Sequence, residues 1–336
     1  MNLLSGNTML TTSKTYILVL LFVSVCFLQC QNPGQPEYLL RASLLVNEDH
    51  TWYRAFVYFG KILEERSLGR MKLEVYPSEQ MAKELEAIRL IQAGVIDMTT
   101  TGSTLNNWME IAAFCEMPFF LKDTLEMKAL MQGAIGQKME KDMLEVCGLR
   151  SLGYFQRGPR HLTSRRPIRH PDELNGLILR VPSVPSFVTA WSAMGAKPTP
   201  MAFSEVFTSL QQGTIEAQEN PFALIRSAGF AEVQQYVNLT EHVISWIYPV
   251  IGEKQFQSFP DDLKKIFLEA AREMQAYEHA IFLKNERAVQ QELQDLGMEF
   301  VEVDKAAFGN KCRKAIYESL SPQNQKHYNE FIESLK

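Results

Sequence analysis

The residue in this sequence best suited to hold a charged ligand is Arg180, because a short apolar run leads into it. Residues 177–179 (Leu-Ile-Leu) have the pattern of a buried strand, and Pro182 stops further strand pairing. We therefore expect Arg180 at the carboxyl end of that strand, where open α/β sheets bind their ligands. A guanidinium is a planar fork of donors that matches a carboxylate with two parallel hydrogen bonds. The alternative interpretation of Arg180 alone is a surface arginine in an ion pair.

Asn220 falls at the end of a second expected strand, over residues 214–218. An amide side chain can donate to a carboxylate oxygen and accept from a hydroxyl group. Polar side chains at neighbouring strand ends converge on one edge of a sheet. The pair Arg180 and Asn220 therefore predicts a site for an organic acid.

Three further candidates lie in the loops between the first expected elements, and each has a structural alternative. His50 is a candidate for contact with a polar ligand, or a solvated residue at the start of a helix. Glu84 is a second candidate, although an acidic residue at a helix start also complements the helix dipole. Thr101 belongs to the hydroxyl-rich stretch 99–103, which suits hydrogen bonding to a hydroxylated ligand.

The elements that carry these residues alternate between strand and helix, which predicts βαβ units, a mostly parallel sheet and an α/β fold. In the first part of the chain the expected strands cover residues 40–45, 72–76 and 96–100, and the expected helices cover 52–67 and 82–93. Farther along, we expect strands over 149–155 and 242–248, helices over 124–146, 186–194 and 204–210, and a long helical stretch over 260–296.

Residues 1–29 have the pattern of an export signal. Lys14 supplies positive charge, and residues 16–28 form an apolar run of 13 residues, a length typical of a signal peptide and short for a membrane span. Cys30 follows this run as in a lipoprotein cleavage site, which predicts lipidation of Cys30. Gln29 stands where such sites usually hold a small residue, so plain cleavage is the alternative. Residues 30–38 then form a polar tether, and a periplasmic protein attached to the membrane only by a lipid on Cys30 is expected.

Composition and missing motifs exclude several functions. The chain has 336 residues, 46% of them hydrophobic, and a net charge of −5. It can bury a sizeable core, and it has no basic cluster for nucleic acid. The three cysteines after the signal form no metal-binding or disulfide pattern, and the sequence contains no G-x-S-x-G, H-E-x-x-H, GxxxxGK or G-x-G-x-x-G. We therefore predict no enzyme activity, no cofactor and no metal site.

Several ordered motifs resemble the solute-binding proteins of TRAP (tripartite ATP-independent periplasmic) transporters, the DctP family. They are residues 160–164 (RHLTS), 179–182 (LRVP), 198–206 (PTPMAFSEV) and 218–221 (QENP). The resemblance covers about residues 39–330 and implies a periplasmic-binding-protein-like α/β fold, with two α/β lobes joined by hinge segments and a long connecting helix. Lobe I would be 39–157 plus about 245–284, and lobe II 158–244 plus about 285–336. The match also places a carboxylate-holding arginine at Arg160.

The resemblance implies capture of a small organic acid outside the cytoplasm and its delivery to a TRAP membrane permease. Arg160, Arg180 and Asn220 would hold the carboxylate. The hydroxyl-rich stretch 99–103, together with His50 and Glu84, favours a sugar acid, most of all a hexuronate such as glucuronate or galacturonate. Sialic acid and a C4-dicarboxylate are alternative ligands. A ligand-sensing subunit of a signalling receptor is an alternative function.

Overall fold

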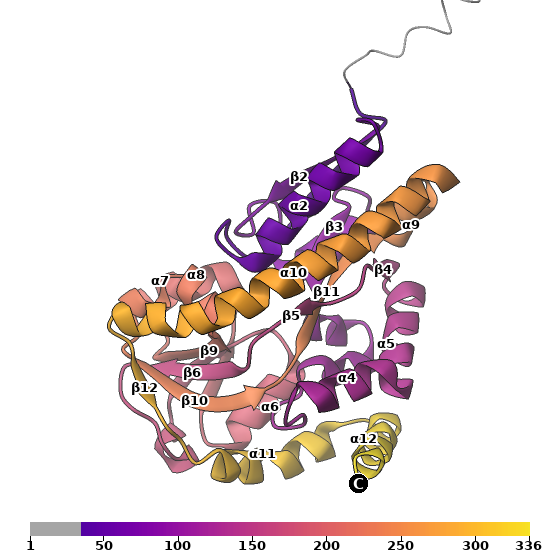
Figure 1. The fold of residues 1–336 in the computed structure, drawn as a ribbon. Helices are drawn as coiled ribbons and strands as arrows, with labels where there is room; N and C mark the ends of the chain where they lie inside the picture. The colour runs from indigo at the N-terminus through magenta and orange to yellow at the C-terminus, as the bar shows by residue number, and fades with distance from the viewer. Residues whose placement is uncertain (1–34) are drawn as a thin grey trace, which may run out of the picture. The chain divides into compact units, whose positions relative to one another are not determined.

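The computed structural model of the protein describes residues 35–336, and they contain two six-stranded sheets surrounded by helices (Figure 1). The predicted signal peptide and Cys30 lie outside the described residues. Within residues 35–336, no helix is both long enough and apolar enough to cross a membrane.

The first sheet has the strand order β2-β1-β3-β11-β4, and β5 also pairs with β11. Its strands are β1 Tyr38–Ser43, β2 Met71–Tyr76, β3 Met98–Thr101, β4 Leu149–Ser151, β5 Phe155–Gln156 and β11 Trp246–Gly252. The strands β1, β2 and β3 run parallel, linked by the helices α2 (Thr51–Arg66) and α3 (Glu84–Gln92). This arrangement confirms the predicted βαβ units, whose amphipathic helices bury one face against the sheet.

The second sheet has the order β12-β10-β6-β9-β7-β8. Its strands are β6 Arg160–Ser164, β7 Ile178–Val181, β8 Lys197–Pro200, β9 Ala217–Pro221, β10 Tyr236–Val243 and β12 Glu299–Val301. The register pairs Arg160 with Pro221 across β6 and β9, and Arg180 with Gln218 across β7 and β9. The motifs RHLTS, QENP and LRVP, which are far apart in the sequence, therefore lie on the adjacent strands β6, β9 and β7.

The remaining helices flank these sheets (Figure 1). They are α4 Thr124–Gln132, α5 Ala134–Glu145, α6 Pro185–Ala193, α7 Val206–Gln212, α8 Phe222–Ser227, α9 Glu253–Gln257, α11 Lys305–Ser319 and α12 Pro322–Ser334, with short 3-10 helices at Ser103–Asn107, Glu110–Glu116, Pro171–Leu174, Phe203–Glu205 and Phe230–Glu232.

The long helix α10 (Asp261–Asp295, 35 residues) packs against the helices α2 and α8 and against strand β5 of the first sheet. Its first half buries Phe267 in the apolar cluster that contains Phe59 of α2, with ring centroids 5.1 Å apart. Its second half buries Leu293 in the cluster that contains Ile225 of α8. Each such side chain contributes about 1.5–3 kcal/mol by leaving water. The predicted long connecting helix is confirmed.

Several predicted elements are wrong in their extent, among them the strand over 149–155, which is the two strands β4 and β5. The expected helix 124–146 is two helices, because Gly133 is extended (ψ −172°) and serves both as the C-cap of α4 and as the N-cap of α5. The expected strand 242–248 is the end of β10 and the start of β11, which belong to different sheets. Asn220 lies inside β9, not beyond a strand that ends at residue 218.

Candidate functional site

One cavity collects most of the polar side chains that the sequence predicted to bind ligand. Its charged and polar lining consists of Glu84, Ser103, Thr104, Glu116, Arg157, Arg160, Arg180 and Asn220, and its apolar lining of Leu45, Pro182, Phe203, Leu224 and Ile247. These residues come from loops, strands and helices around both sheets, and the cavity that they line has a volume of about 30 Å³. A concave site with a few convergent polar groups is the usual form of a small-molecule site.

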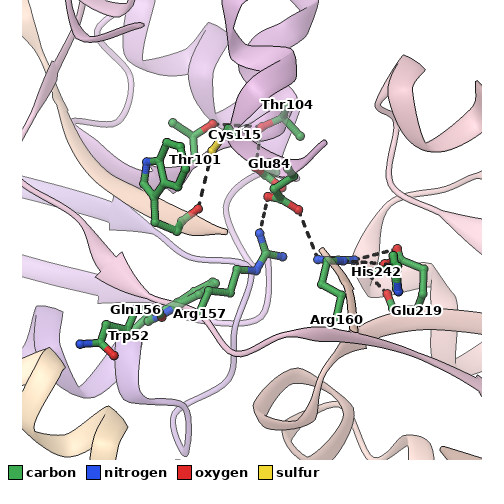
Figure 2. Close-up of polar contacts among 12 residues, drawn as sticks. Trp52, Glu84, Thr101, Thr104, Cys115, Gln156, Arg157, Arg160, Glu219 and His242 are labelled. Carbon is green, nitrogen blue, oxygen red and sulfur yellow. Dashed lines mark hydrogen bonds and ion pairs between the residues drawn. The ribbon is translucent and has the colours of Figure 1, made fainter. Parts of the chain in front are cut away.

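Arg160 is locked into this cavity by Glu219. Its Nε donates to Glu219 Oε2 at 2.5 Å, and its Nη2 donates to Glu219 Oε1 at 2.7 Å and to the main-chain oxygen of Glu219 at 2.9 Å. Its Nη1 lies 3.4 Å from Glu116 Oε2. Arg160 is 1% exposed and Glu219 is fully buried. All three guanidinium nitrogens of Arg160 therefore have protein partners (Figure 2).

His242 also contacts the carboxylate of Glu219. Its Nε2 lies 2.9 Å from Glu219 Oε2, and its Nδ1 lies 2.8 Å from Thr240 Oγ1. Burial alone would raise the pKa of Glu219, but the charge of Arg160 and the hydrogen bonds from His242 and Arg160 outweigh it and lower that pKa to about 2. Glu219 is therefore ionised at neutral pH, and it fixes the position of Arg160.

Arg180 differs from Arg160 in having no carboxylate partner. Its Nε and Nη2 both donate to the main-chain oxygen of Met201, at 3.1 and 2.6 Å. Within residues 35–336, no carboxylate lies within ion-pair distance of Arg180, and its Nη1 has no hydrogen-bond partner. Burial is the main cause that lowers the pKa of Arg180 to about 10. The charge of Glu219 acts on Arg180 only from a distance, and a buried cation without a directly paired carboxylate is costly, so this position favours an anion.

Glu84 and Thr101 belong to a chain of side-chain hydrogen bonds that passes through Thr104 (Figure 2). Thr104 Oγ1 donates to Glu84 Oε1 at 2.5 Å and lies 3.0 Å from Thr101 Oγ1. Burial raises the pKa of Glu84 to about 7. Glu84 and Thr104 line the cavity, whereas Thr101 lies behind Thr104 and is not part of the lining.

Asn220 and His50 have different positions relative to the cavity. Asn220 lines it, and its Nδ2 donates to Gln218 Oε1 at 2.6 Å. His50 is not part of the lining. It is the N-cap of α2, where its Nδ1 accepts from the main-chain N–H of Trp52 at 3.2 Å. Burial, with a smaller contribution from Arg157, lowers the pKa of His50 to about 3. The structure thus brings Arg160, Arg180, Asn220 and Glu84 together, and leaves His50 and Thr101 outside the lining.

Sequence reasoning missed the residues that balance the arginines. Arg157 Nη1 forms an ion pair with Glu116 Oε1, and Glu116 also faces Arg160. Neither Glu116 nor Arg157 is among the residues that the sequence predicts to bind ligand. Glu219 lay within the QENP motif, where the neighbouring Asn220 alone was singled out.

The charges of the site favour a monoanion. Three guanidinium groups, those of Arg157, Arg160 and Arg180, face two ion-paired carboxylates, those of Glu116 and Glu219. Glu84, with a pKa near 7, is only partly ionised at neutral pH. The site therefore carries up to one unbalanced positive charge. Residues 35–336 contain no group of three or more histidine, cysteine, aspartate or glutamate side chains that could hold a metal ion.

Comparisons with known proteins identify a family of similar proteins. Residues 42–329 match the family model described as bacterial extracellular solute-binding protein, family 7. A solute-binding protein of Roseobacter denitrificans is 45% identical over 287 residues, which cover 85% of this chain and 88% of the relative. The 2,3-diketo-L-gulonate-binding periplasmic protein of Escherichia coli is 31% identical over 264 residues, covering 76% and 80%. A solved TRAP periplasmic solute-binding protein from Roseobacter denitrificans, with bound L-galactonate, matches with a TM-score of 0.86 at 43% identity, covering 89% of this chain and 100% of the other.

Proposed function

The chain belongs to the family of bacterial extracellular solute-binding proteins, family 7, and from this premise we propose that it captures a six-carbon sugar acid in the periplasm for a TRAP permease. Residues 1–29 would export it, and a lipid on Cys30 would anchor it to the membrane. The family is one of substrate-binding proteins, so binding and release are its expected activity.

The single observation that carries the proposal is the state of Arg180. It is a buried guanidinium in a lined cavity, with a free Nη1 and no carboxylate partner within residues 35–336. A ligand carboxylate at this point would form charge-assisted hydrogen bonds worth about 1.5–3 kcal/mol each. A ligand without a carboxylate would leave Arg180 unbalanced, so the site should reject the corresponding neutral sugar.

The rest of the lining suits a hydroxylated chain. Glu84, Ser103, Thr104 and Asn220 offer donors and acceptors on the walls of the cavity. The solved Roseobacter relative holds L-galactonate, and the Escherichia coli relative is named for 2,3-diketo-L-gulonate. These names favour a hexonate as the first candidate. The hexuronate predicted from the sequence has the same carboxylate and similar hydroxyls, and is the second.

We also propose that two lobes close on this ligand. Lobe I would be residues 39–157 plus about 245–284, and lobe II residues 158–244 plus about 285–336. All strand residues of the first sheet from Leu39 onward lie in the lobe I ranges, and all strands of the second sheet lie in the lobe II ranges. Both sets contribute to the cavity lining, so closure would remove water from the ion pair and strengthen it.

The test is thermal unfolding of the protein without residues 1–29, after denaturation and refolding to remove any ligand purified with it. The panel contains L-galactonate, galacturonate, sialic acid and succinate. A ligand at about 100 times its dissociation constant stabilises the fold by about 2.7 kcal/mol, a shift of several degrees. Stabilisation by a hexonate or hexuronate is expected. Stabilisation by sialic acid or succinate alone would contradict the sugar-acid proposal.

A further inference from the structure

Arg157 lines the cavity with donors that the protein does not use. It lies in the segment between β5 and β6, and its guanidinium carbon is 5.7 Å from the centre of the Trp52 ring. Its Nη1 pairs with Glu116. Its Nε is buried and unpaired, and its Nη2 has no hydrogen-bond partner within residues 35–336. The side chain is 9% exposed, and it is part of the cavity lining.

A purely structural arginine would not leave these donors unused. Arg160, which faces the same Glu116, has protein partners for Nε, Nη1 and Nη2. A buried polar group without a partner costs about 1–3 kcal/mol. The ion pair with Glu116 and the contact with Trp52 hold the Arg157 guanidinium in a fixed orientation, so its remaining donors are already placed for an oxygen atom in the cavity.

Arg157 and Arg180 come to the cavity from different parts of the fold. In the second sheet β9 lies between β6 and β7, so Arg160 and Arg180 flank β9 on opposite sides. Arg157 comes before β6, follows a strand that pairs with the first sheet, and shares Glu116 with Arg160. Besides burial, the charge of Arg160 lowers the pKa of both Arg157 and Arg180, which indicates that Arg160 lies between the other two arginines. A ligand whose carboxylate is at Arg180 would reach Arg157 with its opposite end.

We propose that Arg157 is a specificity residue that donates hydrogen bonds to hydroxyl or carbonyl oxygens remote from the ligand carboxylate, and so makes the site prefer six-carbon over four-carbon sugar acids. The inference rests on the proposed function. A guanidinium has only donors, so it selects oxygen acceptors. The carboxylate at Arg180 already balances the one surplus positive charge, so a neutral oxygen suits Arg157 better than a second carboxylate. A hydroxyl that accepts from Arg157 can donate to Glu84, which lines the same cavity.

The experiment measures the dissociation constants of L-galactonate, with six carbons, and of D-erythronate, with four, by titration calorimetry. The proteins are the wild type, Arg157→Gln and Arg157→Lys. Arg66→Gln is the matched control, because Arg66 is an exposed arginine whose ion pair with Glu273 lies outside the cavity lining. We expect Arg157→Gln to weaken galactonate binding at least tenfold and erythronate binding less than threefold. Arg66→Gln should change neither.

A ratio of the two dissociation constants that stays at its wild-type value in Arg157→Gln would overturn the inference, because a general loosening of the fold weakens both acids alike. If Arg157→Gln does not fold, Arg157→Lys decides the question. Arg157→Lys keeps a positive charge opposite Glu116 but loses the planar fork of donors. Like Arg157→Gln, it should raise the ratio of the galactonate dissociation constant to the erythronate dissociation constant. A wild-type protein that binds neither acid would overturn the proposed function, and the inference with it.

Discussion

Replacing Arg180 with lysine separates the charge of this residue from its geometry. Lysine keeps the positive charge in the cavity, but it offers a single ammonium in place of the planar fork. In the structure the guanidinium is oriented by two hydrogen bonds to the Met201 oxygen, which leaves Nη1 for the ligand. Arg180→Lys loses this orientation and, with it, a hydrogen bond to the ligand carboxylate. The loss of one hydrogen bond to a charged group is about 1.5–3 kcal/mol, or roughly 10- to 150-fold in affinity.

The assay is titration calorimetry with L-galactonate at low salt, together with thermal unfolding of the ligand-free protein. Because Arg180 has no carboxylate partner in the described part of the chain, Arg180→Lys should leave the ligand-free melting temperature close to that of the wild type. Arg66→Lys, at an exposed ion pair, is the control. An affinity within threefold of the wild type would refute the role of Arg180 as the carboxylate anchor.

Three further predictions follow from other buried charges. Arg160→Met leaves the ionised Glu219 buried without its main partner, so urea unfolding should show a loss of about 3–5 kcal/mol, and an unchanged stability would contradict the ion pair. The affinity for an acid should fall as pH rises from 6 to 8, because Glu84, whose pKa burial raises to about 7, gains a negative charge there. Glu84→Gln should make affinity independent of pH in this range, and a persistent slope would point to another group. Burial raises the pKa of Glu278 from 4.5 to about 8, so between these pH values the folded state holds a proton that the unfolded chain has lost. The free energy of unfolding should therefore fall over this range by on the order of 4 kcal/mol. Glu278→Gln should remove this contribution in urea unfolding at pH 5 and pH 8.5, and equal slopes in both proteins would contradict it.

The local elements at the start of the chain could be predicted because their signals are local. The helix predicted over residues 52–67 is α2, Thr51–Arg66, and Gly69, which follows it, has a φ of +79° that suits glycine. The next helix, predicted over 82–93, is α3, Glu84–Gln92, followed by Gly94 at φ +74°. Apolar periodicity and a terminal glycine determine such boundaries without any knowledge of the rest of the fold.

The charge network of the site could not be predicted, because it depends on strand order. Arg160 and Glu219 are 59 positions apart, and they meet only because β6 pairs antiparallel with β9. Glu116 is 41 positions from Arg157, and the two contact each other through the packing of a 3-10 helix against the segment after β5. Residue type and spacing showed which strand carries Arg180. They did not show that Arg160 is already neutralised while Arg180 is not.

The difference between these two arginines has a consequence for ligand recognition. Arg160 would contribute mainly its charge, because only its Nη1, 3.4 Å from Glu116 Oε2, is weakly bound within the protein. Arg180 would provide the direct contact with the carboxylate. The strand-end pattern predicts Arg180, and the resemblance to the TRAP solute-binding proteins implies the same role for Arg160. Only the position of Glu219 distinguishes them.

The most direct test of the central claim, that this site recognises a carboxylate on a sugar chain, is titration calorimetry of L-galactonate against galactitol, the alditol in which that carboxylate is replaced by a neutral CH₂OH. The protein is refolded and free of ligand, and both compounds have the same hydroxyl pattern along the chain. We predict saturable binding of galactonate and no measurable binding of galactitol. Equal affinities for the two compounds would contradict the claim, because a carboxylate that contributes nothing cannot be what Arg180 holds.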